Sequence, residues 1–186
     1  MKGPSNCTND DNHGVHMKWQ QCRNDLEETI TKSQAFKFIE KFLELQEHTM
    51  MEVCWRYIDK YTGNVFISEY FLKIKQPTLD ALLARDTLLF DEKAIFDAVL
   101  NWAYYLCNCT LLQFEEARES RRKFLGDAIY KIRFHTMKTS EFSPLSRIFR
   151  KILADHEVVD LQMVINGENV RNLKWDTSKQ KREVNF

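Results

Sequence analysis

Four cysteine and histidine side chains near the start of the chain are of the types that bind zinc. Cys7, His13, His16 and Cys22 can supply four nitrogen and sulfur donors, the number that a tetrahedral structural zinc site needs. Their spacing matches no zinc-finger pattern, and three of the four lie in a polar stretch without periodicity. We therefore expect unpaired residues in this segment and no metal site.

The other residues that can do chemistry are isolated from one another. Cys107 and Cys109 are one residue too close for a Cys-x-x-Cys redox motif, and five cysteines without a secretory signal favour free thiols. Neither Gly-x-Ser-x-Gly nor His-Glu-x-x-His occurs, and five scattered glycines form no phosphate-binding loop. His156, between Asp155 and Glu157, is typical of a solvated surface cluster. The sequence predicts no catalytic residue, no cofactor, no small-molecule substrate and no enzyme.

Acidic and basic side chains alternate at helical spacing around residue 120, which predicts ion pairs on an exposed helix face. The residues are Glu115, Glu116, Arg118, Glu119, Arg121 and Arg122. Together with Lys123 the arginines also form a basic run, so a nucleic-acid-binding or nuclear regulatory factor is the alternative class. The neighbouring Phe114 and Phe124 are more typical of core than of base stacking. Because 27 basic residues balance 27 acidic ones, nucleic acid is an unlikely partner.

Helices must position these residues, because 5 glycines and 3 prolines in 186 residues are too few for a turn-rich β-fold. Apolar residues recur at steps of three and four in successive segments, which predicts a series of amphipathic helices. Capping and helix-breaking residues between these segments predict where each helix begins and ends. Thr31 with Gln34 forms a capping box, Gly63 suits a C-terminal cap, Pro77 begins a short helix, and Asp91 caps the next. A long amphipathic helix is expected to run to about Phe134. The predicted fold is all-α, built from antiparallel helix pairs.

The ends of the chain have a different composition from its centre. Residues 1–17 are polar and predict a disordered tail, residues 18–155 predict the helical domain, and residues 156–186 predict a short helix and a frayed C-terminal tail. No stretch is apolar enough for a signal peptide or a membrane span, so we expect a cytosolic protein without membrane contact.

Residues 22–153 resemble the BACK domain of BTB/POZ-BACK proteins. The versions of the motifs present here are similar to those of BTB/POZ proteins that end in a PHR-type β-sandwich. The resemblance rests on Cys22-x-x-Asp25-Leu26, Cys54-Trp55-x-x-Ile58-Asp59, Phe71-Leu72-x-Ile74, Leu79-x-x-Leu82-Leu83-x-Arg85-Asp86-x-Leu88, the run from Glu92 to Ala103, and Ile132-Arg133-Phe134-x-Thr136-Met137.

The resemblance implies a non-enzymatic scaffold of cullin-3 ubiquitin-ligase adaptors, whose relatives are associated with the cytosol and neuronal development. In that family the first BACK helix pair, here residues 32–61, completes the cullin groove. The residues before and after the match are too few for a BTB or PHR domain, so a truncated form is expected. It would be a monomer whose partners are cullin-3 or another BTB-containing chain.

Most of the motif residues specify helix packing. Core positions are expected at Trp55, Trp102, Leu82, Leu83 and Ile132. The predicted partner-facing residues are Phe36, Lys37, Lys41 and Trp19, and an apolar patch is expected at Trp19, Cys22 and Leu26, where a BTB domain would otherwise lie.

Overall fold

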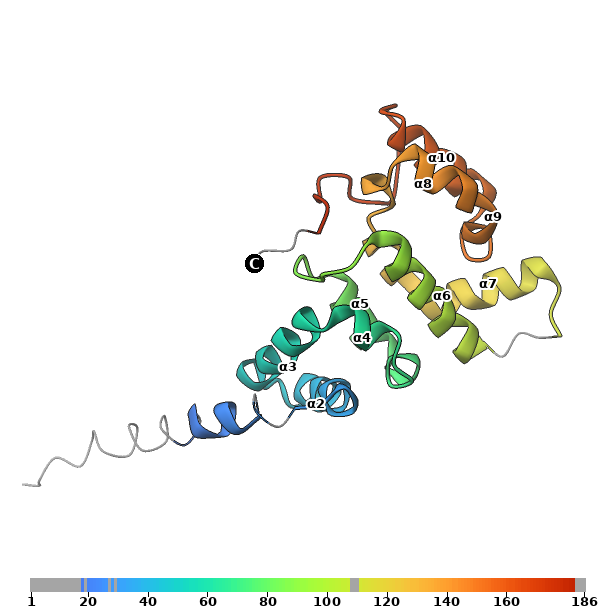
Figure 1. Cartoon of the computed structure of the whole chain (residues 1–186). Helices are drawn as coiled ribbons and strands as arrows, with labels where there is room; N and C mark the ends of the chain where they lie inside the picture. The colour runs from blue at the N-terminus through green and yellow to red at the C-terminus, as the bar shows by residue number, and fades with distance from the viewer. Residues whose placement is uncertain (1–17, 19, 27, 29, 108–110, 183–186) are drawn as a thin grey trace, which may run out of the picture. The chain divides into compact units, whose positions relative to one another are not determined.

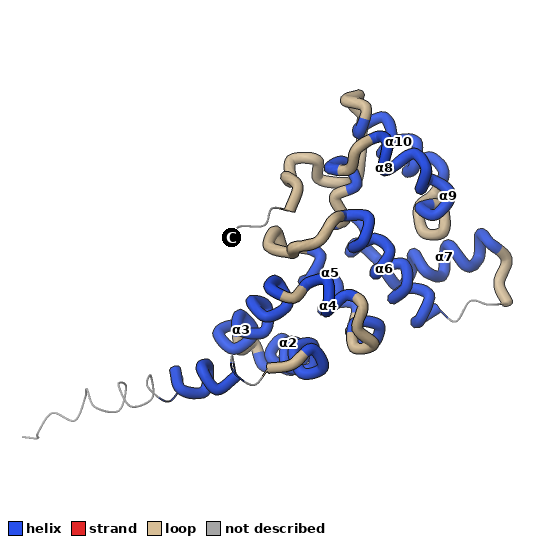
Figure 2. Tube along the Cα trace, in the orientation of Figure 1, coloured by secondary structure: helices blue, strands red, loops and turns tan. Residues whose placement is uncertain are grey.

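The helical fold is present in a computed structural model of the chain, which describes residues 18, 20–26, 28, 30–107 and 111–182. The predicted tail at 1–17 and Trp19 lie outside these residues. Figures 1 and 2 show helices joined by short loops, and no strand occurs in the described ranges. The helices are α2 (Lys32–Leu45), α3 (His48–Lys60), α4 (Thr62–Phe66), α5 (Gln76–Leu83), α6 (Glu92–Cys107), α7 (Phe114–Leu125), α8 (Thr139–Phe142), α9 (Ser146–Phe149) and α10 (Asp155–Ile165). Short 3₁₀ segments are η1 (Phe71–Lys73), η2 (Gly126–Lys131), η3 (Phe134–Thr136) and η4 (Ser143–Leu145).

The chain divides into two compact units, Met1–Tyr57 and Ile58–Phe186, with α3 running across the boundary. In the first unit the predicted cap of α2 is present, since the Thr31 backbone N–H donates to Gln34 Oε1 at 3.1 Å. The helix ends at Gln46, whose φ of 58° turns the chain toward α3. Trp55 on α3 is buried, as predicted for the core.

The prediction that Gly63 ends the third helix is wrong. Gly63 lies inside α4, and a Cβ atom built on it would lie 3.1 Å from the Phe90 ring. The glycine therefore allows close packing against Phe90 and does not adopt a left-handed backbone conformation. Its sequence context cannot distinguish these two uses.

Two predicted helix starts in the second unit are confirmed. Pro77 stands in the first turn of α5, and Asp91 Oδ1 accepts from the Ala94 backbone N–H at 2.9 Å before α6. Trp102 on α6 is fully buried, and its indole N–H donates to the Ile74 carbonyl at 3.0 Å. The core predictions also hold for Leu82, Leu83 and Ile132.

The predicted long helix up to Phe134 is instead shorter. The helix α7 ends at Leu125 because Gly126 adopts φ 53° and ψ −136°, and the chain continues in η2. Gln76 Nε2 donates to the freed Leu125 carbonyl at 3.3 Å. The apolar periodicity continues through the break, which is why the sequence alone overestimated the helix.

Aromatic side chains from η3 and from the helices that pack around it form a cluster in the core of the second unit. Phe96, Phe134, Phe142 and Phe149 are buried and contact one another, with ring centroids between 4.6 and 6.2 Å apart. Trp175, from the C-terminal segment, adds an edge-on contact to Phe134 at 6.1 Å.

This contact corrects the prediction of a frayed C-terminal tail. Trp175 is 4% exposed and donates its indole N–H to the Ile129 carbonyl at 3.3 Å, and Arg182 is also buried. Trp175 and Arg182 therefore anchor the exposed segment between them to the second unit. The segment reads as polar in sequence because its two anchoring side chains are isolated among charged residues.

Candidate functional site

The described cysteines and acidic residues are the first candidates for a reactive thiol or a metal site. Burial raises the pKa of the Cys54 thiol to about 12, so it stays protonated and unreactive. Among the described residues, Cys22 and Cys54 are free thiols, as expected for these two positions. Within the described part of the chain, no three Cys, His, Asp or Glu side chains are placed to hold a metal ion.

The predicted partner-facing residues of the first unit differ in exposure. Phe36 is 3% exposed, so its ring is not part of the surface. Lys37 and Lys41 on the same helix are exposed, and Lys41 Nζ lies 3.6 Å from Glu44. Trp19 lies outside the described residues. The structure thus leaves two lysines of α2 as the accessible part of this predicted surface.

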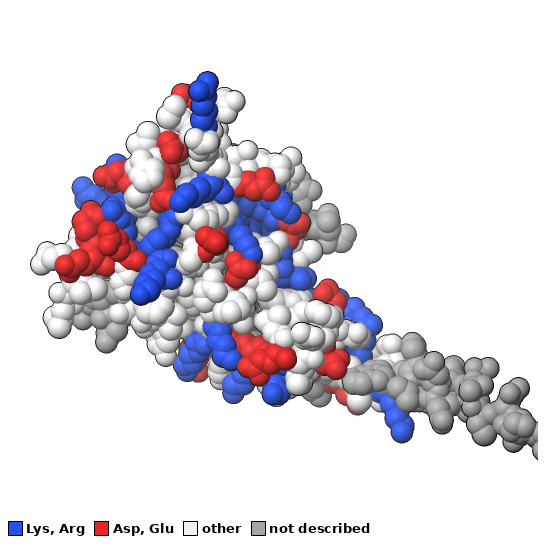
Figure 3. Space-filling view, turned by 180° about the vertical axis from the view of Figure 1, so that it is seen from behind, with Lys and Arg blue, Asp and Glu red and all other residues white. Residues whose placement is uncertain are grey.

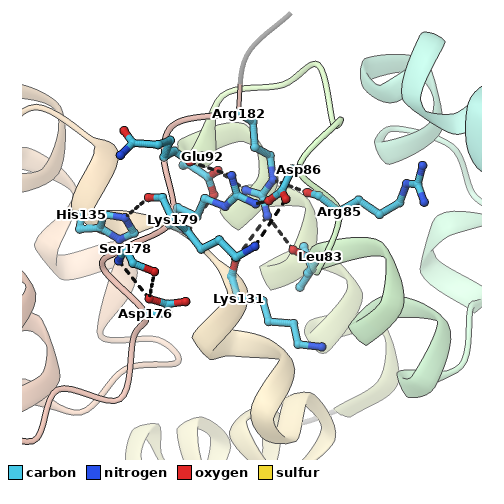
Figure 4. Close-up of polar contacts among 12 residues, drawn as sticks. Leu83, Arg85, Asp86, Glu92, Lys131, His135, Asp176, Ser178, Lys179 and Arg182 are labelled. Atoms are coloured by element: carbon cyan, nitrogen blue, oxygen red, sulfur yellow. Dashed lines mark hydrogen bonds and ion pairs between the residues drawn. The ribbon is translucent and has the colours of Figure 1, made fainter. Parts of the chain in front are cut away.

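The second unit contains a closed charge cluster, which we call the Glu92 cluster and define as Glu92, Arg182, Arg133 and Asp86. Figure 4 labels Glu92, Arg182 and Asp86. Glu92 begins α6, and its carboxylate forms an ion pair with Arg182 and accepts from the Arg133 backbone N–H at 3.0 Å. The side chains of Arg182 and Glu92 are 1% and 3% exposed. Two full charges are therefore neutralised inside the fold.

Backbone carbonyls complete the hydrogen bonds of Arg182. Its guanidinium donates to the carbonyls of Leu83 at 2.7 Å and Arg85 at 3.0 Å. Burial lowers the pKa of Arg182, while the charge of Glu92 opposes that change. The arginine thus ties the C-terminal segment to the loop after α5.

The rim of the cluster is more open than its centre. Asp86, on the loop between α5 and α6, pairs with Arg133 and lies 3.4 Å from Lys179. Burial by itself would raise the pKa of Asp86, but its hydrogen bonds and charge attraction to Arg133 and Lys179 bring it below the usual value. Arg133 also donates to the Gln180 carbonyl at 2.7 Å. These contacts hold residues 179–182 in place.

A second charged cluster in the same unit is open to solvent, and we call it the Tyr130 cleft. It is a cleft of about 540 Å³ whose walls come from α7, the start of α10, Tyr130 and Lys174. Arg122 donates to both oxygens of Glu157, at 2.7 and 3.1 Å, and to the Tyr130 hydroxyl at 2.7 Å. Glu157 is 8% exposed. The prediction that residues 155–157 form a solvated surface cluster is therefore wrong for Glu157.

The predicted pairing along the helix around residue 120 is only partly present. Arg118 pairs with Glu115 as expected. Arg121 is instead 4% exposed, donates to the Lys151 carbonyl at 3.0 Å and lies over the Tyr104 ring. Arg122 pairs with Glu157, 35 residues away. Partners distant in sequence have replaced the neighbours that helical spacing offered.

The face seen in Figure 3 has no extended region of one charge. In Figure 3 basic and acidic side chains lie next to one another over the face in view. Among the described residues, every helix is too short or too polar to cross a bilayer. Tyr130, Lys174, Glu92 and Arg182 belong to no sequence pattern that predicts a charged site. A local indication of the packed C-terminal segment is Trp175, a large aromatic residue in an otherwise polar tail.

Comparison with known proteins agrees with this helical architecture. The family model described as BACK, "BTB And C-terminal Kelch", matches residues 34–147. BTB/POZ domain-containing protein 3 of Homo sapiens is 34% identical over 122 residues, which are 66% of this chain and 23% of that protein. BTB/POZ domain-containing protein 6 of Xenopus laevis is 33% identical over the same length and the same shares. No solved structure matches.

The chain therefore belongs to the BACK family, as its motifs indicated. It spans less than a quarter of the length of the curated relatives that it matches. Family membership and these relatives support a protein-interaction module of the adaptor type, and they point to a non-enzymatic family.

Proposed function

We propose that this chain is an interaction module of cullin-3 ubiquitin-ligase adaptors and that residues 32–61 are its cullin-facing helix pair. The observation that carries the proposal is the BACK match to residues 34–147, which takes in nearly all of α2 and α3. We also propose that the chain is cytosolic, is a monomer in isolation and is linked to neuronal development. Its partners are cullin-3 or a BTB-containing chain.

The side chains of α2 support a polar contact. Lys37 and Lys41 are exposed and one helical turn apart, so both can meet acidic groups of a partner. Phe36 is buried and supports the helix from inside. The proposed boundaries, a helical domain at 18–155 with the helix pair at 32–61, place this surface at the start of the module.

Calorimetric titration with the cullin-3 N-terminal domain tests the proposal, with a BTB-BACK adaptor as positive control. We expect a dissociation constant tighter than about 10 μM, or about −6.8 kcal/mol at 25 °C. The double substitution Lys37→Glu and Lys41→Glu should weaken binding about fivefold or more, because both charges are reversed. The matched control is Lys138→Glu, an exposed lysine of the second unit.

Circular dichroism first establishes that each variant is folded. Absence of heat from a folded chain, both alone and with the BTB domain of human BTB/POZ domain-containing protein 3 added, would contradict the proposal. Equal loss of affinity in Lys138→Glu would show that the cullin contact is not on α2.

A further inference from the structure

The Tyr130 cleft contains more basic than acidic side chains. Of the residues that line it, Arg118, Arg122, Lys123 and Lys174 are basic, whereas Glu119 and Glu157 are acidic. Arg118 pairs with Glu115 on its own helix and Arg122 with Glu157, so the basic side chains left without an ion pair in the described ranges are Lys123 and Lys174. His156 lies on the same wall. The chain as a whole has no net charge, so this excess is a local property of the cleft.

Two of the basic side chains converge on one phenol. The Tyr130 hydroxyl oxygen accepts from Arg122 Nη2 at 2.7 Å and from Lys174 Nζ at 3.0 Å. Both cations also lie over the ring, 4.9 and 5.3 Å from its centroid. Because the oxygen already accepts two hydrogen bonds, the hydroxyl proton is free to donate to an acceptor in the cleft.

The acidic side chains of the cleft do not balance these cations. Both oxygens of Glu157 bind Arg122, and one also accepts from the Ala154 backbone N–H at 2.9 Å. Among the described residues Lys174 forms no ion pair, and its bond to Tyr130 raises its pKa, so it is charged at neutral pH. Lys123, exposed on α7, also has no carboxylate partner within the described ranges.

We propose that the Tyr130 cleft binds carboxylate side chains of an acidic segment in a protein partner. The Tyr130 hydroxyl, the Lys174 ammonium and the Lys123 ammonium supply the donors, and the Arg122–Glu157 pair holds Tyr130 in position. A cleft of about 540 Å³ has room for a short peptide segment. The site lies in the second unit and does not depend on cullin-3 binding, so it goes beyond the function proposed above.

Two observations favour an acidic peptide over nucleic acid. The Tyr130 ring is already contacted by Arg122, Lys174 and, edge-on, Trp175, so it is not an unoccupied platform for base stacking. Acidic side chains at Glu119 and Glu157 interrupt the basic wall, whereas a nucleic-acid groove follows the backbone with continuous positive charge.

Fluorescence anisotropy with a labelled octaglutamate peptide, in low salt of about 50 mM, tests the proposal. Lys174→Glu and Lys123→Glu should each weaken binding about tenfold, because each replaces an attraction with a repulsion. Lys73→Glu is the matched control: Lys73 is 54% exposed, lies outside the cleft, and should change affinity less than about twofold. Tyr130→Phe removes only the hydroxyl and should weaken binding about threefold.

Octaglutamine and an eight-nucleotide oligothymidylate complete the design. We expect no binding of octaglutamine and weaker binding of the oligonucleotide. The proposal is overturned if the oligonucleotide binds more tightly than octaglutamate, or if the cleft variants and Lys73→Glu bind octaglutamate equally. Both lysines are exposed, and a thermal melt confirms that each variant is folded.

Discussion

The Glu92 cluster and the Tyr130 cleft are built from the same types of side chain but differ in solvent access. In the first, Arg182 and Glu92 are almost fully buried, and backbone carbonyls and an amide satisfy their remaining groups. In the second, Lys174 is exposed and its described polar contact is a phenol that already binds another cation. Charge in the first cluster is balanced, and in the second it is in excess.

This difference teaches how to separate structural from interaction charge in a BACK-family chain. A buried ion pair whose groups are already hydrogen-bonded cannot bind a partner. Removing one member of the pair destabilises the fold, because the other member is left as an unpaired buried charge. Exposed cations in excess contribute little to folding and remain able to bind. Substitutions in the Glu92 cluster should therefore change stability, and those in the Tyr130 cleft should change affinity.

The largest expected effect comes from Glu92→Gln. The substitution keeps the shape of the side chain but leaves Arg182 as an uncompensated buried charge, so the free energy of unfolding should fall by about 3–5 kcal/mol. Urea unfolding followed by circular dichroism measures it. Glu69→Gln, at an exposed pair with Lys73, is the control and should cost less than about 1 kcal/mol. A loss below about 1 kcal/mol for Glu92→Gln would mean that the cluster is not structural.

A smaller and mixed effect is expected for Glu157→Gln. Arg122 is partly exposed and can be hydrated, so the stability loss should be only about 1–2 kcal/mol. Removing a negative charge from the cleft should also strengthen octaglutamate binding about threefold. Glu119→Gln is the matched control, because it should strengthen binding without loss of stability. Weaker peptide binding by Glu157→Gln, but not by Glu119→Gln, would show that losing the support of Tyr130 by the Arg122–Glu157 pair outweighs the removal of a negative charge.

The smallest effect is expected at Asp86, on the open rim of the Glu92 cluster. Its pKa is lower in the folded chain than the ordinary value of 3.8, so it stabilises the fold above that pH and ceases to do so as the pH falls through the lower folded value. Because the side chain is 62% exposed, Asp86→Asn should cost less than about 1 kcal/mol at pH 7. Urea unfolding at pH 7 and pH 3 should show this difference shrinking; an unchanged difference would exclude Asp86 ionisation as its source.

Local sequence rules predicted the helices and much of the core, but not the charged clusters. The caps at Thr31 and Asp91 and the burial of Trp102 follow from residues within a few positions of each other. Glu92 and Arg182 are 90 residues apart, so no spacing rule relates them. Arg121 and Arg122 looked exposed because helical spacing offered nearby acids, whereas the folded chain supplied distant partners. The C-terminal tail was predicted to be frayed because the two side chains that hold it, Trp175 and Arg182, are isolated in a polar sequence.

The most direct test of the account compares Glu92→Gln with Lys174→Glu in both assays. We predict that Glu92→Gln lowers the unfolding midpoint strongly while the folded protein binds octaglutamate as the unsubstituted chain does. Lys174→Glu should leave the midpoint unchanged and weaken octaglutamate binding about tenfold. If both variants lost stability and affinity together, the separation of structural from interaction charge in this fold would be contradicted.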